Sequence, residues 1–157
     1  MEESDWATTP TAGPKRRRRN KDENIIIYRK ELRHLTGSVK SALLMGQLEY
    51  WFSRPKVQNC FYKFLSPCGS HLYKPGDSWT EELGFTEDEF NTAFDKIGVR
   101  FSSRKQYKQD IKKREKAKKA FYYSIHNKIQ HVTFYYRNGD VIRAAMQRNS
   151  KQSRSDF

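Results

Sequence analysis

This sequence has no long hydrophobic run and none of the features of a secretory signal. No apolar stretch approaches the roughly 20 residues that a helix needs to cross a membrane. The chain begins MEESDWATTP, which is acidic and polar, whereas a secretory signal is basic and then apolar. The pattern therefore predicts no membrane partner and, by elimination, a cytoplasmic location.

Cysteine and histidine are scarce, and their spacing disfavours a metal site. Cys60 and Cys68 are the only cysteines, and the chain has neither a C-x-x-C nor an H-x-x-x-H pair, although zinc sites are commonly built on such pairs. Reduced, incidental thiols are the better interpretation. A glycine-rich phosphate loop is also missing, and the four histidines have no evident nucleophile partner. We therefore predict a non-enzymatic protein with no metal and no cofactor.

Acidic residues are in the minority. The 157 residues include 31 Lys+Arg against 18 Asp+Glu, which gives a formal net charge of +13. This balance favours a polyanionic partner, and nucleic acid is the default, with DNA favoured over RNA. Aromatic residues make up 14% of the chain, which argues against a wholly disordered basic protein. We expect one domain with tails, associated with the nucleoid, or nuclear if the host is eukaryotic.

Residues 1–24 lack an apolar period and carry the basic run KRRRR at residues 15–19. We interpret them as a disordered basic arm. Such an arm can lie along phosphates or enter a minor groove, and a tail that only adds solubility is the alternative. The arm residues expected to bind nucleic acid are Arg16, Arg17, Arg18 and Arg19.

The next part of the chain predicts a helix and a strand. Residues 36–53 carry a broad apolar stripe that includes Leu44, Leu48 and Trp51, and Thr36 or Ser38 can cap this helix. We expect Trp51 to be a core residue because it lies inside the stripe. Residues 60–65, CFYKFL, predict a strand, and residues 25–27, III, predict a strand or an extended lead-in.

The clearest local signals lie in residues 77–98, DSWTEELGFTEDEFNTAFDKIG. Capping boxes at residues 78–81 and 86–89 start two helices, and Gly84 can end the first. Apolar residues at i, i+3, i+4 and i+7 then form the buried face of the second helix: Phe90, Ala93, Phe94 and Ile97. So short a link predicts a helix-turn-helix, although a plain helical hairpin would carry the same pattern.

A basic segment follows at residues 100–119, with ten cations and two carboxylates. Tyr107 and Ile111 provide too little apolar surface for a buried helix, so we interpret the segment as an exposed helix or a flexible stretch.

The remainder of the chain predicts a β-hairpin and a tail. Residues 121–136 alternate with period two as the two strands of the hairpin. Asn138-Gly139 predicts a tight turn, residues 141–142 a third short strand, and residues 147–157 a frayed, flexible tail.

The predicted order is helix, strand, helix-turn-helix and β-hairpin. With the runs TGSVKSALLMGQLEYWFSR, CFYKF and SWTEELGFTEDEFNTAFDKIG, it resembles the winged-helix domains of phage- and plasmid-borne replication or regulatory proteins. The resemblance implies an α+β winged-helix domain over residues 25–146, with the basic segment inserted at residues 100–119. It also implies DNA binding through the second helix of the helix-turn-helix and the hairpin wing.

The acidic start of that second helix departs from the winged-helix pattern, because residues 87–89 would repel phosphate. The residues of this helix that can still reach bases are Asn91, Thr92 and Lys96. The alternative function is a protein-interaction adaptor or inhibitor in a nucleoprotein assembly, which would dock its protein partner through Asp88 and Asp95.

The positive charge has moved from the recognition helix to the basic segment and the wing, where it predicts sequence-tolerant binding of phosphates. The cations expected to bind nucleic acid there are Arg104, Lys105, Lys108, Lys112, Lys113, Lys116, Lys119 and, on the hairpin, Lys128. The alternative is an internal salt-bridge zipper between this segment and the seven carboxylates of residues 77–95.

Overall fold

The computed structural model describes the backbone of residues 25–155 and the side chains of residues 25–152. The predicted basic arm, with Arg16, Arg17, Arg18 and Arg19, lies outside the described residues. Within them the elements are, in chain order, α2 (Lys30–Thr36), α3 (Val39–Phe52), β1 (Cys60–Lys63), α4 (Trp79–Leu83), α5 (Glu87–Asp95), β2 (Gly98–Phe101), α6 (Arg104–Lys113), α7 (Lys116–Lys119), β3 (Tyr122–Asn127), β4 (Val132–Arg137) and α8 (Gly139–Ser155).

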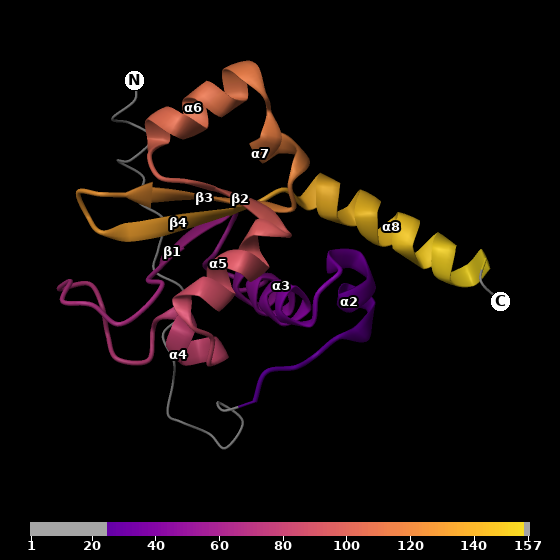
Figure 1. Ribbon diagram of the computed structural model, residues 1–157, viewed down its shortest axis with the longest axis horizontal. Helices are drawn as coiled ribbons and strands as arrows, with labels where there is room; N and C mark the ends of the chain where they lie inside the picture. The colour runs from indigo at the N-terminus through magenta and orange to yellow at the C-terminus, as the bar shows by residue number, and fades with distance from the viewer. Residues whose placement is uncertain (1–24, 156–157) are drawn as a thin grey trace.

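The four strands form one mixed sheet in the order β1-β4-β3-β2. β4 pairs antiparallel with both β1 and β3, whereas β2 runs parallel to β3. In Figure 1, α6 and α7 lie above the sheet, and α3, α4 and α5 lie below it. The predicted α+β class is confirmed, and the sheet separates two groups of helices.

The helix-turn-helix signals are confirmed in the structure. Ser78 and Glu81 form a complete capping box at the start of α4, and Thr86 and Glu89 form a second one at the start of α5. Gly84 ends α4 with φ of 70°, a left-handed conformation that disfavours any residue with a Cβ. Local hydrogen bonding therefore sets the bounds of both helices.

The main hydrophobic core lies between the sheet and the lower helices. The residues expected to pack together all belong to it: Leu44, Leu48, Trp51, Trp79, Phe90, Phe94 and Ile97 are buried, and Leu83 is partly buried. Phe61 and Tyr135 supply the sheet side of this core, and their ring centroids are 5.5 Å apart. The expectation that Trp51 is a core residue is therefore confirmed.

An ion pair is buried within this core. Lys63 and Glu82 are 5% and 7% exposed, and Lys63 Nζ lies 3.4 Å from Glu82 Oε1. Trp51 Nε1 donates to the other carboxylate oxygen at 2.9 Å, and the ammonium lies 4.3 Å from the centroid of the same indole. Because each charge is met by several partners, the pair is tolerated where a lone buried charge would be strongly unfavourable.

A second polar cluster joins α3 to strands β3 and β4. Arg137 donates to both oxygens of Glu49, at 2.8 and 2.9 Å, and the hydroxyl of Tyr122 donates to Glu49 at 2.7 Å. Three charge-assisted hydrogen bonds therefore hold the two central strands onto α3.

The sequence pattern did not reveal β2. The helix-turn-helix signals stop at Gly98, and the basic segment follows them directly in the sequence. In the structure, however, Gly98 begins a strand. A Cβ at this position would lie 2.8 Å from the backbone oxygen of Tyr122 and 2.8 Å from the ring of Phe94. The close approach between β2 and β3 therefore requires glycine here, a constraint that local sequence patterns do not reveal.

The C-terminal predictions are wrong. Asn138-Gly139 is not a hairpin turn, because Gly139 begins α8, and this helix takes in both the predicted third strand at residues 141–142 and most of the predicted tail. Ile142 and Ala145, one helical turn apart, are buried, and Asn149 donates to the backbone oxygen of Glu31 in α2 at 3.4 Å. These tertiary contacts favour helix where the local signals favour a turn and a tail.

Two further predictions concern the N-terminal end of the described chain. Residues 25–27 are an extended lead-in, which was one of the two predicted forms. The predicted helix at residues 36–53 begins at Val39, and Ser38 caps it by accepting a hydrogen bond from the backbone N–H of Ser41. Thr36 ends the preceding helix α2, followed by Gly37 in the left-handed conformation.

Replacing Phe94 with alanine should lower the free energy of unfolding by about 3–5 kcal/mol, because the side chain is fully buried and packs against Phe90 and Tyr135. Urea unfolding followed by circular dichroism measures this decrease. Thr92→Ala on the exposed face of the same helix is the control and should change stability by less than about 0.5 kcal/mol. Equal decreases for the two variants would show that α5 does not pack as described.

Candidate nucleic-acid interface

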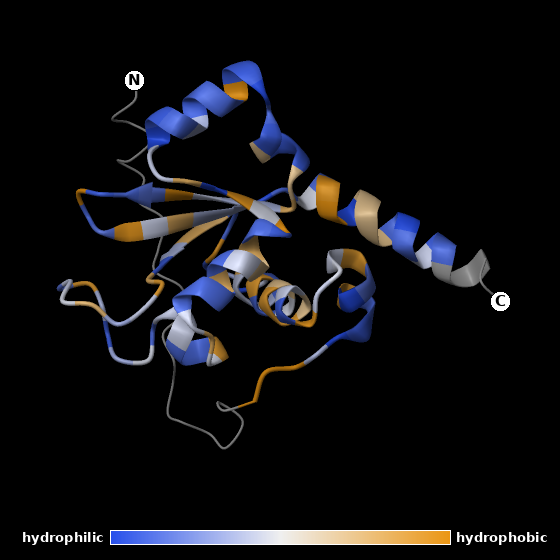
Figure 2. Ribbon diagram, viewed as in Figure 1, coloured by the Kyte–Doolittle hydropathy of each residue, from blue (hydrophilic) through white to orange (hydrophobic). Residues whose placement is uncertain are grey.

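The basic segment forms a helical layer on the upper face of the sheet. Phe101, Ala117 and Ile125 make a small buried cluster, and Tyr107 and Ile111 pack against it. The ring of Tyr107 stacks on Tyr123 at 5.1 Å. The few apolar residues of the segment are therefore enough to dock α6 and α7, although most of their surface is hydrophilic (Figure 2).

Asp110 sets the position of α7. Its two carboxylate oxygens accept hydrogen bonds from the backbone N–H groups of Lys116 and Ala117, at 3.2 and 2.9 Å. At the other end of α7, the side-chain amide of Asn138 donates to the backbone oxygens of Ala117 and Ala120. Asp110, which the sequence suggests is only a minor counter-charge, is therefore a structural cap.

The outward face of α6 and α7 is strongly cationic. We call this face the basic crossover surface, and its exposed residues are Lys105, Lys112, Lys113, Arg114, Lys116, Lys118 and Lys119. Lys118 lies 3.5 Å from Glu115 in an exposed ion pair. Arg104 and Lys108, also predicted to bind nucleic acid, are half-buried at the edge of the same layer.

Arg100, at the start of the basic segment, makes an ion pair of the kind that the predicted salt-bridge zipper requires. Arg100 of β2 makes two hydrogen bonds to Asp95 of α5, at 2.7 and 2.8 Å, and these bonds raise the pKa of the guanidinium. The sheet separates α5 from α6 and α7 (Figure 1). α5 and the basic crossover surface therefore lie mainly on opposite sides of the sheet, although Asp95 and Lys116 line one groove at its edge.

Most of the carboxylates around α5 already have partners. Glu89 completes its capping box and pairs with Lys40, whose hydrogen bond holds the pKa of Glu89 below its ordinary value. Glu87 accepts from Ser66 at 3.2 Å. Of the two residues predicted to dock a protein, Asp95 is bound to Arg100 and Asp88 is exposed.

A groove opens between α5 and the β3–β4 hairpin, with a volume of about 690 Å³. We call it the hairpin groove. Its cations are Arg100, Lys116 and Lys128, and its one carboxylate is Asp95. Amides from Asn91 on α5 and Gln106 on α6 also line it. The groove runs along the whole of β2, residues 98–101, and reaches His126 near the end of β3.

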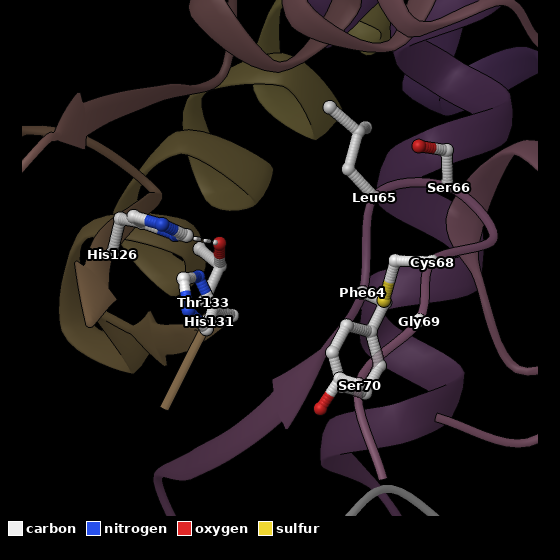
Figure 3. A pocket seen from close by; sticks show the side chains of 9 residues that line it. All are labelled: Phe64, Leu65, Ser66, Cys68, Gly69, Ser70, His126, His131 and Thr133. Atoms are coloured by element: carbon white, nitrogen blue, oxygen red, sulfur yellow. Dashed lines mark hydrogen bonds between the residues drawn. The ribbon is translucent and has the colours of Figure 1, made fainter. Parts of the chain in front are cut away.

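A second cavity, of about 620 Å³, adjoins the hairpin groove and shares Leu65, His126 and Thr133 with it. Figure 3 shows His126, His131 and Thr133 on one wall and the loop of residues 64–70 on the other. His126 Nδ1 and Thr133 Oγ1 are 3.0 Å apart, joined by a hydrogen bond. Burial, and then the nearby His131 and Lys128, lower the pKa of His126.

Four predicted site residues, from three separate parts of the sequence, line the hairpin groove together: Asn91, Asp95, Lys116 and Lys128. Thr92 and Lys96 are exposed on α5 and do not line it. Sequence reasoning missed Arg100, Gln106 and His126 as groove residues. Their signal is weak because each is an ordinary polar residue, and only the pairing of β2 with β3 brings them together.

A search of protein-family models, curated proteins and solved structures found no match to this chain.

Among the described helices, none combines the length and the apolar character needed to cross a membrane. In the part of the chain with described side chains, no group of three or more His, Cys, Asp and Glu residues is placed to hold a metal ion. Burial raises the pKa of the Cys60 thiol to about 12, which keeps it protonated at neutral pH.

Asp110→Ala should lower the free energy of unfolding by about 1–3 kcal/mol, because two backbone N–H groups at the start of α7 would then have no acceptor. Glu115→Gln removes the same charge from an exposed ion pair and should cost less than about 0.5 kcal/mol. Urea unfolding of both variants separates the cap from the charge. A similar cost for both would mean that Asp110 acts only as a counter-charge.

The lowered pKa of His126 predicts a pH effect on stability. The unfolded chain binds a proton at this residue more readily than the folded protein, so stability falls as pH drops below the ordinary histidine value of 6.5. His126→Gln should remove this part of the pH dependence, whereas His34→Gln at an exposed site serves as the control. An NMR titration that places the pKa of His126 at or above 6.5 would contradict the prediction.

Proposed function

We propose that this protein is a non-enzymatic nucleic-acid-binding protein that holds the phosphate backbone on its basic crossover surface. One observation carries the proposal. Within the described residues, six cations of this surface have no ion-pair partner: Lys105, Lys112, Lys113, Arg114, Lys116 and Lys119. Exposed positive charge on one face is the electrostatic footprint of phosphate binding, because each neutralised phosphate releases counterions.

The two alternatives have less support. An internal zipper would need carboxylates near α6 and α7, but the acidic helix lies across the sheet. A protein-docking role for α5 would have to draw on Asp88 and on Asp95, which is already bound to Arg100. Among the described residues, the unpaired cations of the basic crossover surface lie on the other side of the sheet from α5.

The finer fold and setting are part of the same proposal. A helix, a strand and the α4–α5 pair occur in this order before the β3–β4 hairpin, with β2, α6 and α7 between the pair and the hairpin. We infer a winged-helix-like protein with Lys128 on its wing, and DNA as the more favoured nucleic acid. A role in phage or plasmid replication or regulation, close to the nucleoid, fits this proposal.

Replacing Lys112, Lys113, Lys116 and Lys119 with glutamine should weaken binding about equally for duplexes of different sequence. The slope of log affinity against log salt should fall by up to about 0.9 for each phosphate that is no longer neutralised. Fluorescence anisotropy titrations over a range of salt concentrations measure both quantities. Melting temperature should barely change, because all four side chains are exposed.

A matched variant tests whether position matters or only net charge. Lys30, Arg33, Lys56 and Lys74 are exposed on α2 and in loops, and replacing them with glutamine removes the same charge. The control should keep most of the salt slope. An equal decrease in both variants would show that the total charge, and not the basic crossover surface, attracts nucleic acid. A lower melting temperature with an unchanged slope would point to internal pairing.

A further inference from the structure

We propose that the hairpin groove binds a single strand of nucleic acid, with its bases turned toward the groove and its phosphates toward Lys116 and Lys128. This inference rests on the proposed function and adds the form of nucleic acid that the site prefers. It concerns a cavity distinct from the outward face of α6 and α7, although the two are joined through one residue.

Lys116 makes the connection between the two surfaces. It belongs to α7 on the basic crossover surface, and its side chain also lines the hairpin groove. A phosphate backbone that lies on α6 and α7 can therefore pass the edge strand β2 and enter the groove while it stays close to positively charged side chains. Because β2 is the edge of the sheet, the path is not closed by another strand.

The lining of the groove suits an unstacked base. Asn91 and Gln106 offer side-chain amides, which can both donate and accept at a base edge. The carbonyl of Gln106 already accepts from the backbone N–H of Ser102 at 2.9 Å, which orients this amide. Half-buried Leu65 and Val99 add apolar surface for a base face. A duplex hides these edges and faces, whereas a single strand presents both.

The charge distribution also favours one strand over two. Of the three cations in the groove, Arg100 is bound to the one carboxylate, Asp95, which leaves the charges of Lys116 and Lys128. A duplex laid across α5 would bring a second row of phosphates toward exposed Asp88 and the other carboxylates of the helix start. A single strand has one row of phosphates, and it can follow the cations and avoid the acidic face.

Asn91→Trp tests the inference without changing charge, because the indole would fill the groove from its α5 wall. Asn59→Trp, at an exposed position just before β1, is the matched control. Fluorescence anisotropy would compare a labelled single strand of about 20 nucleotides with its duplex, as DNA and as RNA. DNA and RNA share the chemistry that the groove recognises, and the two sets of probes show which one it prefers.

We expect Asn91→Trp to change single-strand binding about tenfold, because the indole either blocks a base or stacks on it, and to leave duplex binding within about twofold. Asn59→Trp should leave both unchanged. If Asn91→Trp fails to fold, as its melting curve would reveal, Asn91→Ala should still weaken single-strand binding about threefold by removing one base contact.

Equal changes in the affinity for the single strand and for the duplex, or no change in either affinity, would overturn the single-strand inference. Binding of the duplex alone by the unaltered protein would also overturn it and leave the proposed function standing. Failure of the unaltered protein to bind either form at low salt would overturn the proposed function itself.

Discussion

The parallel pairing of β2 with β3 is the constraint on which the rest of this structure depends. Parallel neighbours cannot be joined by a tight turn, so the chain must cross over one face of the sheet before it returns. Residues 102–121 make that crossing, and they carry most of the basic segment. The segment is therefore a necessary connection of the fold and not an insertion into it. Gly98 permits the pairing, because a Cβ there would meet the backbone of Tyr122.

This crossover separates charge of opposite sign across the sheet. The acidic start of α5 lies below the sheet, where capping boxes and ion pairs occupy most of its carboxylates. The helices α6 and α7 lie above it, and most of their cations are exposed. Exposed ion pairs contribute little to stability, so the arrangement has little effect on folding. Its main consequence is a positive electrostatic potential over the face formed by α6 and α7.

The hairpin groove follows from the same topology. Asn91, Arg100, Lys116 and Lys128 come from α5, β2, α7 and the hairpin, and they meet along the edge strand β2. Asp110 and Asn138 hold α7 at both ends and thereby fix the place of Lys116. The residues that position the cations are therefore different from the residues that would contact a ligand.

The sequence by itself determined the elements whose signals are local: the two capping boxes, the turn at Gly84 and the apolar stripes that place Trp51 and Phe94 in the core. It also determined that residues 100–119 would be cationic and largely exposed. Only the tertiary structure decided β2, α8 and the hairpin groove. β2 is four residues long and is stabilised by a partner more than twenty positions away. α8 begins at an Asn-Gly pair that favours a turn locally, and burial of Ile142 and Ala145 decides for helix. Such long-range contacts outweigh local preference because the free energy of burial belongs to the assembled core and not to any one segment.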